Sequence, residues 1–210
     1  MTVRLTEVEA RVLGSLIEKD MATPEYYPMS LNALVNASNQ KSNRDPVVSY
    51  DESRVSAAVD SLREKRLATV ITGGDNRVPK HGHLASQTLN LGNRELAPLC
   101  VLLLRGPQTG GELKGRTERL HAFDDVEAVE NCLARMAEAG LAMQLARQPG
   151  TREPRWTHLL CGAPVERPAE AVPAVSKPDR VTALEAAVEE LRGEMQQLRE
   201  EFATFRRQFE

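Results

Sequence analysis

Two stretches of the sequence carry the same order of predicted elements: three helical patterns, then two β-prone runs separated by turn residues. The apolar positions of the two third helices superpose at a constant offset of 74 residues. The matching pairs are Val55/Val129, Val59/Leu133, Leu62/Met136 and Leu67/Leu141. Four matches in one register, within one element order, indicate an internal duplication.

The first copy starts with a helical pattern over Leu5–Lys19, in which Thr6 and Glu9 are spaced as a capping box. Ser30 is expected to cap a short second helix, and a third helix is expected from about Asp51 to Arg66. The run Gly-Gly-Asp-Asn that separates the following β-prone segments is typical of a hairpin turn.

The second copy has a buried-looking helix over Leu96–Leu104, a short helix capped by Thr109, and a third helix that begins at Asp124 or Asp125. A hairpin pattern with a Pro-Gly tip closes it. This order of elements is that of the winged helix, a helix-turn-helix with a β-wing. The sequence therefore predicts an α+β, mainly helical chain with two winged-helix domains in tandem, at residues 1–92 and 93–162.

The C-terminal part is predicted to form a Pro- and Ala-rich linker over residues 163–178 and a coiled-coil helix over residues 179–210. Apolar residues recur in that helix at alternating spacings of three and four, as in a coiled coil. The positions expected to form a dimer interface are Val181, Leu184, Val188, Leu191, Met195, Leu198, Phe202 and Phe205. We expect a parallel homodimer; the alternative is that this helix folds back onto its own domains.

Composition narrows the classes of protein that remain. The chain carries 27 Lys and Arg against 30 Asp and Glu, which argues against wholesale polyanion binding. Three widely spaced cysteines exclude a disulfide framework and indicate a reducing compartment. The N-terminus has no apolar signal core, and the longest apolar run is about half a membrane span. We therefore expect a cytoplasmic protein that does not enter a membrane.

Several segments resemble the YceH family of bacterial proteins. They are EARVLGSLIEK, TPEYYPMSLNALVNASNQKSNRDPV, GGDNRVPK, LLLRGPQTGGELKGR and RQPGTREPRWTHL. The resemblance covers about Leu5 to Leu160, which is nearly both copies, and NQKSNRDPV is its most distinctive part. It implies two winged-helix domains, in agreement with the element order, and it transfers no catalytic or binding residue.

The third helix of the first copy is where a winged helix would contact duplex DNA. Polar and cationic side chains are expected near its start, on the hairpin and in the loop before it. These candidate nucleic-acid-binding residues are Asn39, Lys41, Arg44, Ser53, Arg54, Ser56, Arg77 and Lys80. The alternative for the loop is that its amides cap helix ends and satisfy its own backbone.

The second copy differs at the corresponding surface. Its third helix is expected to display Glu127, Glu130 and Glu138, and carboxylates there would repel phosphate. Its hairpin carries three arginines beside Trp156. We interpret Trp156 as a core strand residue and the arginines as partners of the helix's glutamates. This copy is predicted to be a protein-contact or scaffold module.

Enzymatic motifs are weak. His81 and His83 could both lie on one side of a strand, but no carboxylate or Cys at ligand spacing completes a metal site, and we interpret them as exposed hairpin histidines. Cys100 and Cys132 are expected in the core, and Cys161 is the thiol expected to be accessible. We expect no enzyme, no cofactor and no metal.

Two functions stay open at this stage. One is a DNA-binding, transcriptional-regulator-like protein that uses the first winged helix. The other is a protein–protein adaptor built on tandem winged helices without direct DNA contact.

Overall fold

The computed structural model describes residues 3–73, 76–147, 153–163, 193, 195 and 196. Contacts between residues divide the chain into two units, Met1–Pro164 and Val165–Glu210. In the second unit the described residues Gly193, Met195 and Gln196 are helical. The first unit is a mixed α+β structure with two small antiparallel sheets.

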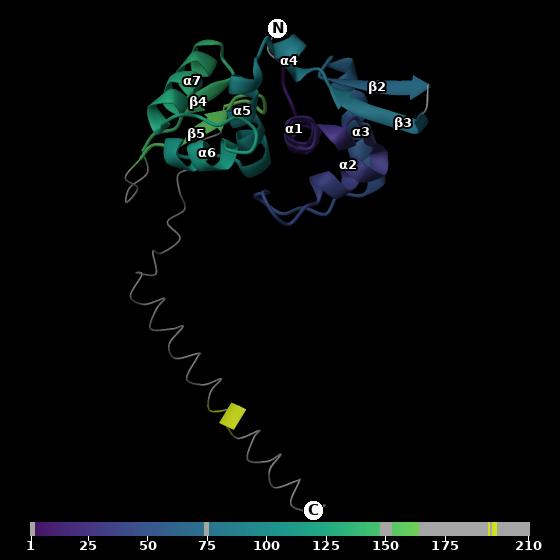
Figure 1. Ribbon diagram of the computed structural model, residues 1–210, viewed down its shortest axis with the longest axis horizontal. Helices are drawn as coiled ribbons and strands as arrows, with labels where there is room; N and C mark the ends of the chain where they lie inside the picture. Colours follow the sequence, from purple (N-terminus) through teal and green to yellow (C-terminus); the bar gives the residue numbers. More distant parts are fainter. Residues whose placement is uncertain (1–2, 74–75, 148–152, 164–192, 194, 197–210) are drawn as a thin grey trace, which may run out of the picture. The chain divides into compact units, whose positions relative to one another are not determined.

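The first half of this unit contains three helices and a three-stranded sheet (Figure 1). In chain order these are α1 (Glu7–Ala22), a 3-10 turn η1 (Pro24–Tyr26), β1 (Met29–Ser30), α2 (Leu31–Ser38), α3 (Glu52–Glu64), β2 (Ala68–Gly73) and β3 (Asn76–His83). The strands are antiparallel in the order β1-β3-β2. The predicted hairpin of β2 and β3 is therefore present, and β3 is the central strand of the sheet.

The second half repeats this order after a short helix, α4 (Ala85–Leu89). It consists of α5 (Asn93–Arg105), α6 (Gly110–Thr117), α7 (Val126–Glu138), β4 (Ala142–Gln144) and β5 (Trp156–His158). The two strands pair antiparallel. An isolated bridge between Gln108 and Trp156 adds a third segment before α6, where the first half has β1 before α2.

The predicted helix caps are confirmed. Thr6 Oγ1 accepts the N–H of Glu9 at 3.3 Å, and the Glu9 carboxylate accepts the N–H of Thr6 at 2.6 Å. Ser30 caps α2 and Thr109 caps α6. Each cap satisfies N–H groups that have no partner within the helix, so these residues determine where the helices begin.

The register of the duplication is confirmed where the third helices end. Arg66 and Gly140, which are 74 residues apart, both have positive φ, 57° and 71°. The next residues repeat one hydrogen bond: Leu67 N–H donates to Leu62 O at 2.8 Å, and Leu141 N–H donates to Met136 O at 2.9 Å. This is a Schellman-type end, in which the left-handed residue turns the chain toward the first hairpin strand.

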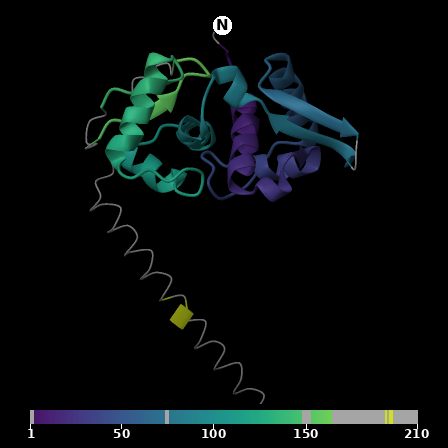
Figure 2. The ribbon, with the colours of Figure 1, turned by 45° about the horizontal axis from the view of Figure 1, so that its top comes forward.

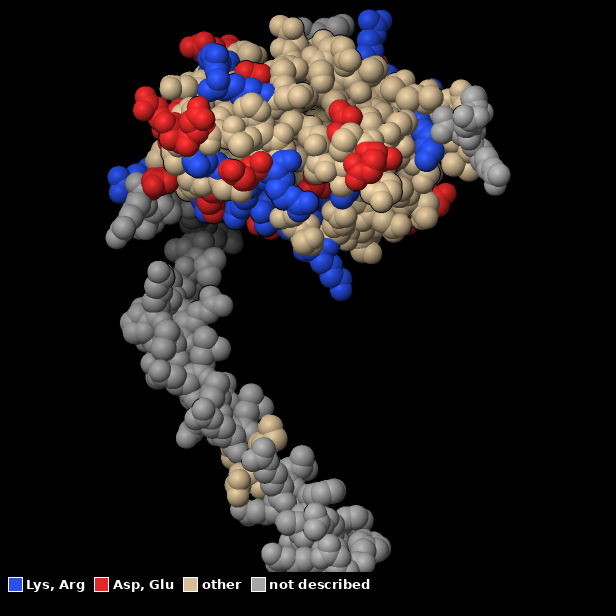
Figure 3. Space-filling model, in the orientation of Figure 1, with Lys and Arg blue, Asp and Glu red and all other residues tan. Residues whose placement is uncertain are grey.

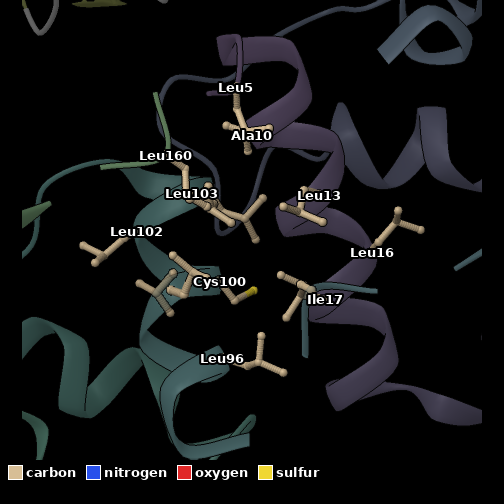
Figure 4. Packing of buried hydrophobic residues seen from close by; sticks show 14 of the residues in the cluster. Leu5, Ala10, Leu13, Leu16, Ile17, Leu96, Cys100, Leu102, Leu103 and Leu160 are labelled. Carbon is tan, nitrogen blue, oxygen red and sulfur yellow. The ribbon is translucent and has the colours of Figure 1, made fainter. Parts of the chain in front are cut away.

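The two halves share one hydrophobic core. Figure 2 shows α1 and α5 at the centre, with the remaining helices on either side. Leu13 and Ile17 of α1 face Leu96 and Cys100 of α5 in Figure 4. At Gly14 a Cβ atom would lie 2.9 Å from Leu104 Cδ2, so glycine permits this close helix contact.

Candidate nucleic-acid interface

The start of α3 forms an exposed polar surface. Asp51 caps the helix: its Oδ1 accepts the Arg54 N–H at 2.8 Å and the Ser53 hydroxyl at 2.7 Å. The bond from the Ser53 hydroxyl, followed by that from the Arg54 N–H, holds the pKa of Asp51 below its ordinary value. The carboxylate next to Arg54 is therefore ionised, and it is turned toward the helix terminus by these bonds.

Arg54 lies on an aromatic ring. Its guanidinium carbon is 4.9 Å from the centroid of Tyr50, the residue four positions earlier. Arg54 is exposed, and no carboxylate in the described part of the chain forms an ion pair with it. A cation stacked in this way keeps its hydrogen-bond donors available at the edge of the guanidinium. Tyr50 was not among the sequence candidates, because it lies before the Asp51 cap and outside the helix.

The rest of the outward face of α3 is mixed. Ser56 is half-buried and Ala57 is exposed. Arg63, further along the helix, forms an ion pair with Asp60 at 3.1 Å, so its charge is partly compensated. The cationic character of this face is therefore concentrated at the start of the helix.

Asn39 has a structural position in the loop between α2 and α3. Its Nδ2 donates to Tyr50 O at 2.7 Å, and its Oδ1 accepts the Tyr50 N–H at 2.8 Å. These two hydrogen bonds to the backbone N–H and C=O of Tyr50 hold the chain just before α3. Both bonds tie the loop to the residue that precedes the Asp51 cap. Lys41, in the same loop, is exposed.

Arg44 is a correction to the predicted set. Its side chain is fully buried, and its guanidinium binds both oxygens of Glu18, with Nη2 at 2.7 Å from Oε2 and Nη1 at 3.1 Å from Oε1. It also donates to the carbonyl oxygens of Ala37 and Asn43. A guanidinium so occupied joins the loop to α1 and is not available to phosphate.

The hairpin also differs from expectation. Lys80 does not lie at its tip: it pairs with Ile71 on one side and Ser30 on the other, within the three-stranded part of the sheet, and it is half-buried. The backbone of Arg77 lies in β3 beside the Gly73–Asn76 pair that closes the hairpin. The side chain of Arg77 lies outside the described residues. Arg77 is therefore the predicted hairpin cation whose backbone is nearest the tip.

The two hairpin histidines are not exposed, contrary to the prediction. The imidazole of His83 is 4% exposed; its Nε2 is 3.0 Å from Asp20 Oδ2, and its Nδ1 accepts the Ala85 N–H at 3.2 Å. Burial lowers the pKa of His83, and Asp20 acts against that shift. His81 is half-buried, and burial lowers its pKa as well. Alternation along β3 turns both imidazoles inward, because residues two apart lie on one face of a strand.

The second half has the expected surface on α7. Glu127, Glu130 and Glu138 are exposed, and Trp156 is buried at 8% exposure. The predicted arginine pairing is different in detail. Arg155 lies 3.6 Å from Glu112 of α6 rather than against a glutamate of α7.

The remaining predicted features have the following outcomes. Of the predicted dimer positions, Met195 is 56% exposed, and the other seven lie outside the described residues. Cys100 and Cys132 are buried and Cys161 is exposed, as expected. Within the described ranges, no group of three His, Cys, Asp or Glu side chains is placed to hold a metal ion. No described helix is long and apolar enough to cross a bilayer.

Comparison with known proteins adds a family. A family model described as "Protein of unknown function, DUF480" matches residues 5–151. A UPF0502 protein of Solibacter usitatus is 53% identical over 207 residues, covering 96% of this chain and 100% of the relative. UPF0502 proteins of Pelobacter propionicus and Aeromonas hydrophila are each 48% identical, over 221 and 213 residues, covering 100% and 97% of this chain and 100% and 98% of those relatives.

Proposed function

The chain belongs to the DUF480 family of bacterial proteins, also named UPF0502, and from its geometry we propose that it binds duplex DNA through the first half of the folded unit. In this proposal α3 is the recognition helix of a winged helix and the β2–β3 hairpin is its wing. The family that matches is DUF480, and the resemblance to the YceH family stays a prediction from the sequence. The proposal contains no catalytic step.

The order of elements supports the winged-helix part of the proposal. Helices α1, α2 and α3, with β1 before α2 and a hairpin after α3, follow one another in the order expected of a winged helix. The sheet order β1-β3-β2 agrees with a hairpin that extends from the edge of the helical body. The second half repeats the order and is proposed as a second winged helix.

Arg54 is the observation that carries the DNA-binding proposal. It combines exposure, a position at the N-terminal end of α3 and stacking on Tyr50 at 4.9 Å. In a helix-turn-helix the N-terminal residues of the recognition helix contact base edges, and arginine donates to the O6 and N7 acceptors of guanine. Ser53 lies beside it, while Lys41 and Arg77 are proposed to contact phosphates. Asn39 and Arg44 would act indirectly, by holding the loop.

A homodimer through residues 179–210 belongs to the same proposal. Two chains joined by a parallel coiled coil would present two copies of α3, which suits a DNA site with two related halves. Deletion of residues 179–210 should then convert a dimer into a monomer in light scattering, and a full-length chain that is already monomeric would contradict this part.

The test is fluorescence anisotropy with mixed-sequence duplexes across a salt series, using the full chain. Arg54→Gln should weaken binding at least fivefold at each salt concentration, because a donor to the base edges is lost. The matched control is Arg135→Gln, which removes one exposed arginine from α7 and should leave binding unchanged. Equal effects of the two substitutions would show non-specific attraction and contradict a role for α3.

A graft gives a stronger form of the same test. Ser53→Glu with Ser56→Glu places on α3 the acids that α7 has at Glu127 and Glu130. DNA binding should then be lost, while the midpoint of thermal unfolding stays within a few degrees because neither serine is buried.

The exposed acids of α7 favour a second candidate function, a protein–protein adaptor. Glu127 and Glu130 lie beside Val126, which is 38% exposed, so this face combines charge with apolar surface. Absence of DNA binding by the full chain at low salt would favour the adaptor over the DNA-binding proposal.

A further inference from the structure

A cleft of about 380 Å³ lies where the two halves of the folded unit meet. Its walls come from the end of α1, the loop after α2, α5 and α6. The volume is within the range of about 300–1,000 Å³ that holds small-molecule ligands. None of the predicted DNA-binding residues lines it, so it is distinct from the surface at the start of α3.

Cations dominate the charge of this cleft. Lys19, Arg105, Arg116 and Arg119 line it, against one acidic residue, Glu18. The carboxylate of Glu18 is already bound by the buried Arg44 through both oxygens. In Figure 3 one group of Lys and Arg side chains lies near the lower middle of the folded unit, and others lie at its upper left, top and right.

Two of these arginines form no ion pair in the described part of the chain, although the charges of Asp45 and Glu112 act on Arg105. Neither Arg105 nor Arg119 forms an ion pair with a carboxylate among the residues that the structure describes. Burial, followed by the neighbouring charge of Arg116, lowers the pKa of Arg105. Arg116 reaches Glu112 only at 3.6 Å, and Glu112 is shared with Arg155. Like charges gathered in a partly desolvated cleft favour an anion that would neutralise them.

The cleft also has an apolar wall and neutral hydrogen-bonding groups. Leu120 is half-buried and offers apolar surface, whereas the lining residues Val101 and Leu104 are 5% and 2% exposed. Gln40, Ser42 and Asn43 bring donors and acceptors from the loop. Arginine forks match the oxygens of a phosphate group, and an apolar wall suits a planar or hydrocarbon part of the same molecule. The combination fits a small phosphorylated compound better than a bare inorganic ion.

We propose that this cleft binds a phosphorylated small molecule of about nucleotide size. The phosphate oxygens contact Arg105, Arg116 and Arg119, with Lys19 adding charge, and the non-phosphate part packs on Leu120. Because α1 and the α2–α3 loop belong to one half while α5 and α6 belong to the other, the bound molecule contacts both halves.

The experiment uses the full chain and two fluorescent probes, N-methylanthraniloyl-ADP and N-methylanthraniloyl-adenosine. The first should bind saturably with a Kd below about 1 mM, and the second, which lacks phosphate, should bind at least tenfold more weakly. Inorganic pyrophosphate should compete with the ADP probe. Absence of saturable binding by the ADP probe at low salt, or equal binding of both probes, would overturn the proposal.

Substitutions locate the binding. Arg116→Gln and Arg119→Gln should each raise the Kd for the ADP probe about tenfold or more, as expected for loss of a charge-assisted hydrogen bond. Arg135→Gln, an exposed arginine on α7 outside the cleft, should leave the Kd unchanged. Thermal unfolding of each variant checks that it is folded. Equal affinities for the wild type and both cleft variants would place the probe elsewhere and overturn the proposal.

A competition measurement with duplex DNA distinguishes this cleft from the proposed DNA interface. A mixed-sequence duplex should not displace the ADP probe, and Arg54→Gln should not change probe affinity. Displacement by duplex, together with weaker duplex binding by Arg119→Gln, would make the cleft part of a DNA interface and overturn the small-molecule assignment.

Discussion

Helices α3 and α7 have the same length, cap and C-terminal turn, but their exposed side chains differ in charge. Each has 13 residues, begins after an Asp cap, at Asp51 and Asp125, and ends in the same turn. The outward positions at the shared offset of 74 differ throughout the first turns: Ser53, Arg54 and Ser56 in α3 stand where α7 has Glu127, Ala128 and Glu130. The caps and the buried stripe therefore determine the helix, and the exposed positions are free to differ.

This difference lies in the exposed residues, while the buried residues of the two helices correspond. A duplicated domain keeps its inward positions because substitutions there cost packing energy, while exposed positions change at little cost. An acidic helix cannot approach phosphates as a helix with an unpaired arginine can. The proposal that the first half binds DNA rests on this difference.

A buried histidine also occurs at the same place in both copies. His83 pairs with Ala68 across β2 and β3, and His158 pairs with Ala142 across β4 and β5. His83 contacts Asp20, whereas burial alone lowers the pKa of His158 to about 4. The sequence comparison missed this pair because hairpins of different length interrupt the constant offset.

The largest expected difference between the halves concerns their ion pairs. Arg44→Met should lower the free energy of unfolding by about 3–5 kcal/mol, because it leaves Glu18 and two carbonyl oxygens without their buried partner. Arg155→Met, which removes a partly exposed pair with Glu112, should cost about 0–1 kcal/mol. Urea denaturation measures both. Similar costs would show that Arg44 is not structural and would return it to the DNA-binding candidates.

Unlike the ion pairs, the equivalent core positions of the two halves should contribute similar amounts to the free energy of unfolding. Leu62 and Met136 are 0% and 1% exposed, so truncation of either to alanine should cost about 2–5 kcal/mol. Since α1 and α5 join the halves in one core, each variant should unfold in a single transition at a lower denaturant concentration. Two separated transitions would show that the halves unfold independently.

Local features of the fold could be predicted from the sequence because short-range chemistry determines them. Thr6, Ser30 and Thr109 cap helices through bonds to residues three positions away, and the third helices are specified by their apolar stripes. The burial of Arg44 could not be predicted in this way. Its partner, Glu18, is 26 residues away and reaches it only after the loop has packed on α1.

The contact between the two halves could be predicted in part from the sequence. Every residue from Leu96 to Leu104 is buried, and a helix that is apolar on all sides must be covered on all sides. The sequence therefore indicated a buried α5 but not that α1 would cover it. For the candidate interface, Ser53 and Arg54 followed from their helical position. The inward direction of His81 and His83 could not be predicted, because it depends on the strand register. A shift of one residue would place both side chains on the other face of the sheet.

The histidines should give the halves different responses to acid. The pKa of His158 is about 4 in the folded chain and about 6.5 when unfolded, so the unfolded state binds more protons as the pH falls below 6.5. The free energy of unfolding is therefore unaffected by His158 above pH 6.5 and falls as the pH decreases toward 4. The loss is about 2–3 kcal/mol at pH 4.5. His158→Gln should remove this loss.

The matched variant is His83→Gln, which should remove a smaller acid-dependent loss because Asp20 acts against the effect of burial on His83. Urea denaturation at pH 7.5 and pH 4.5 gives both differences. An acid-dependent loss that is unchanged in His158→Gln would contradict a buried neutral imidazole in the second half.

The smallest expected effect concerns the turns that end α3 and α7. Arg66 and Gly140 occupy the same left-handed position, where a residue with a Cβ costs about 1–2 kcal/mol, less the extra chain entropy that glycine loses on folding. Arg66→Gly should therefore stabilise the chain by about 0.5–1 kcal/mol, and Gly140→Ala should destabilise it by a similar amount. A Cβ at Gly140 would meet no atom within 4 Å, so the cost is one of backbone conformation and not of packing. Arg66→Ala is the control, since it keeps the Cβ and should leave the denaturation midpoint nearly unchanged. If Arg66→Ala stabilised the chain as much as Arg66→Gly, the side chain of Arg66 rather than its φ would set the difference between the two turns.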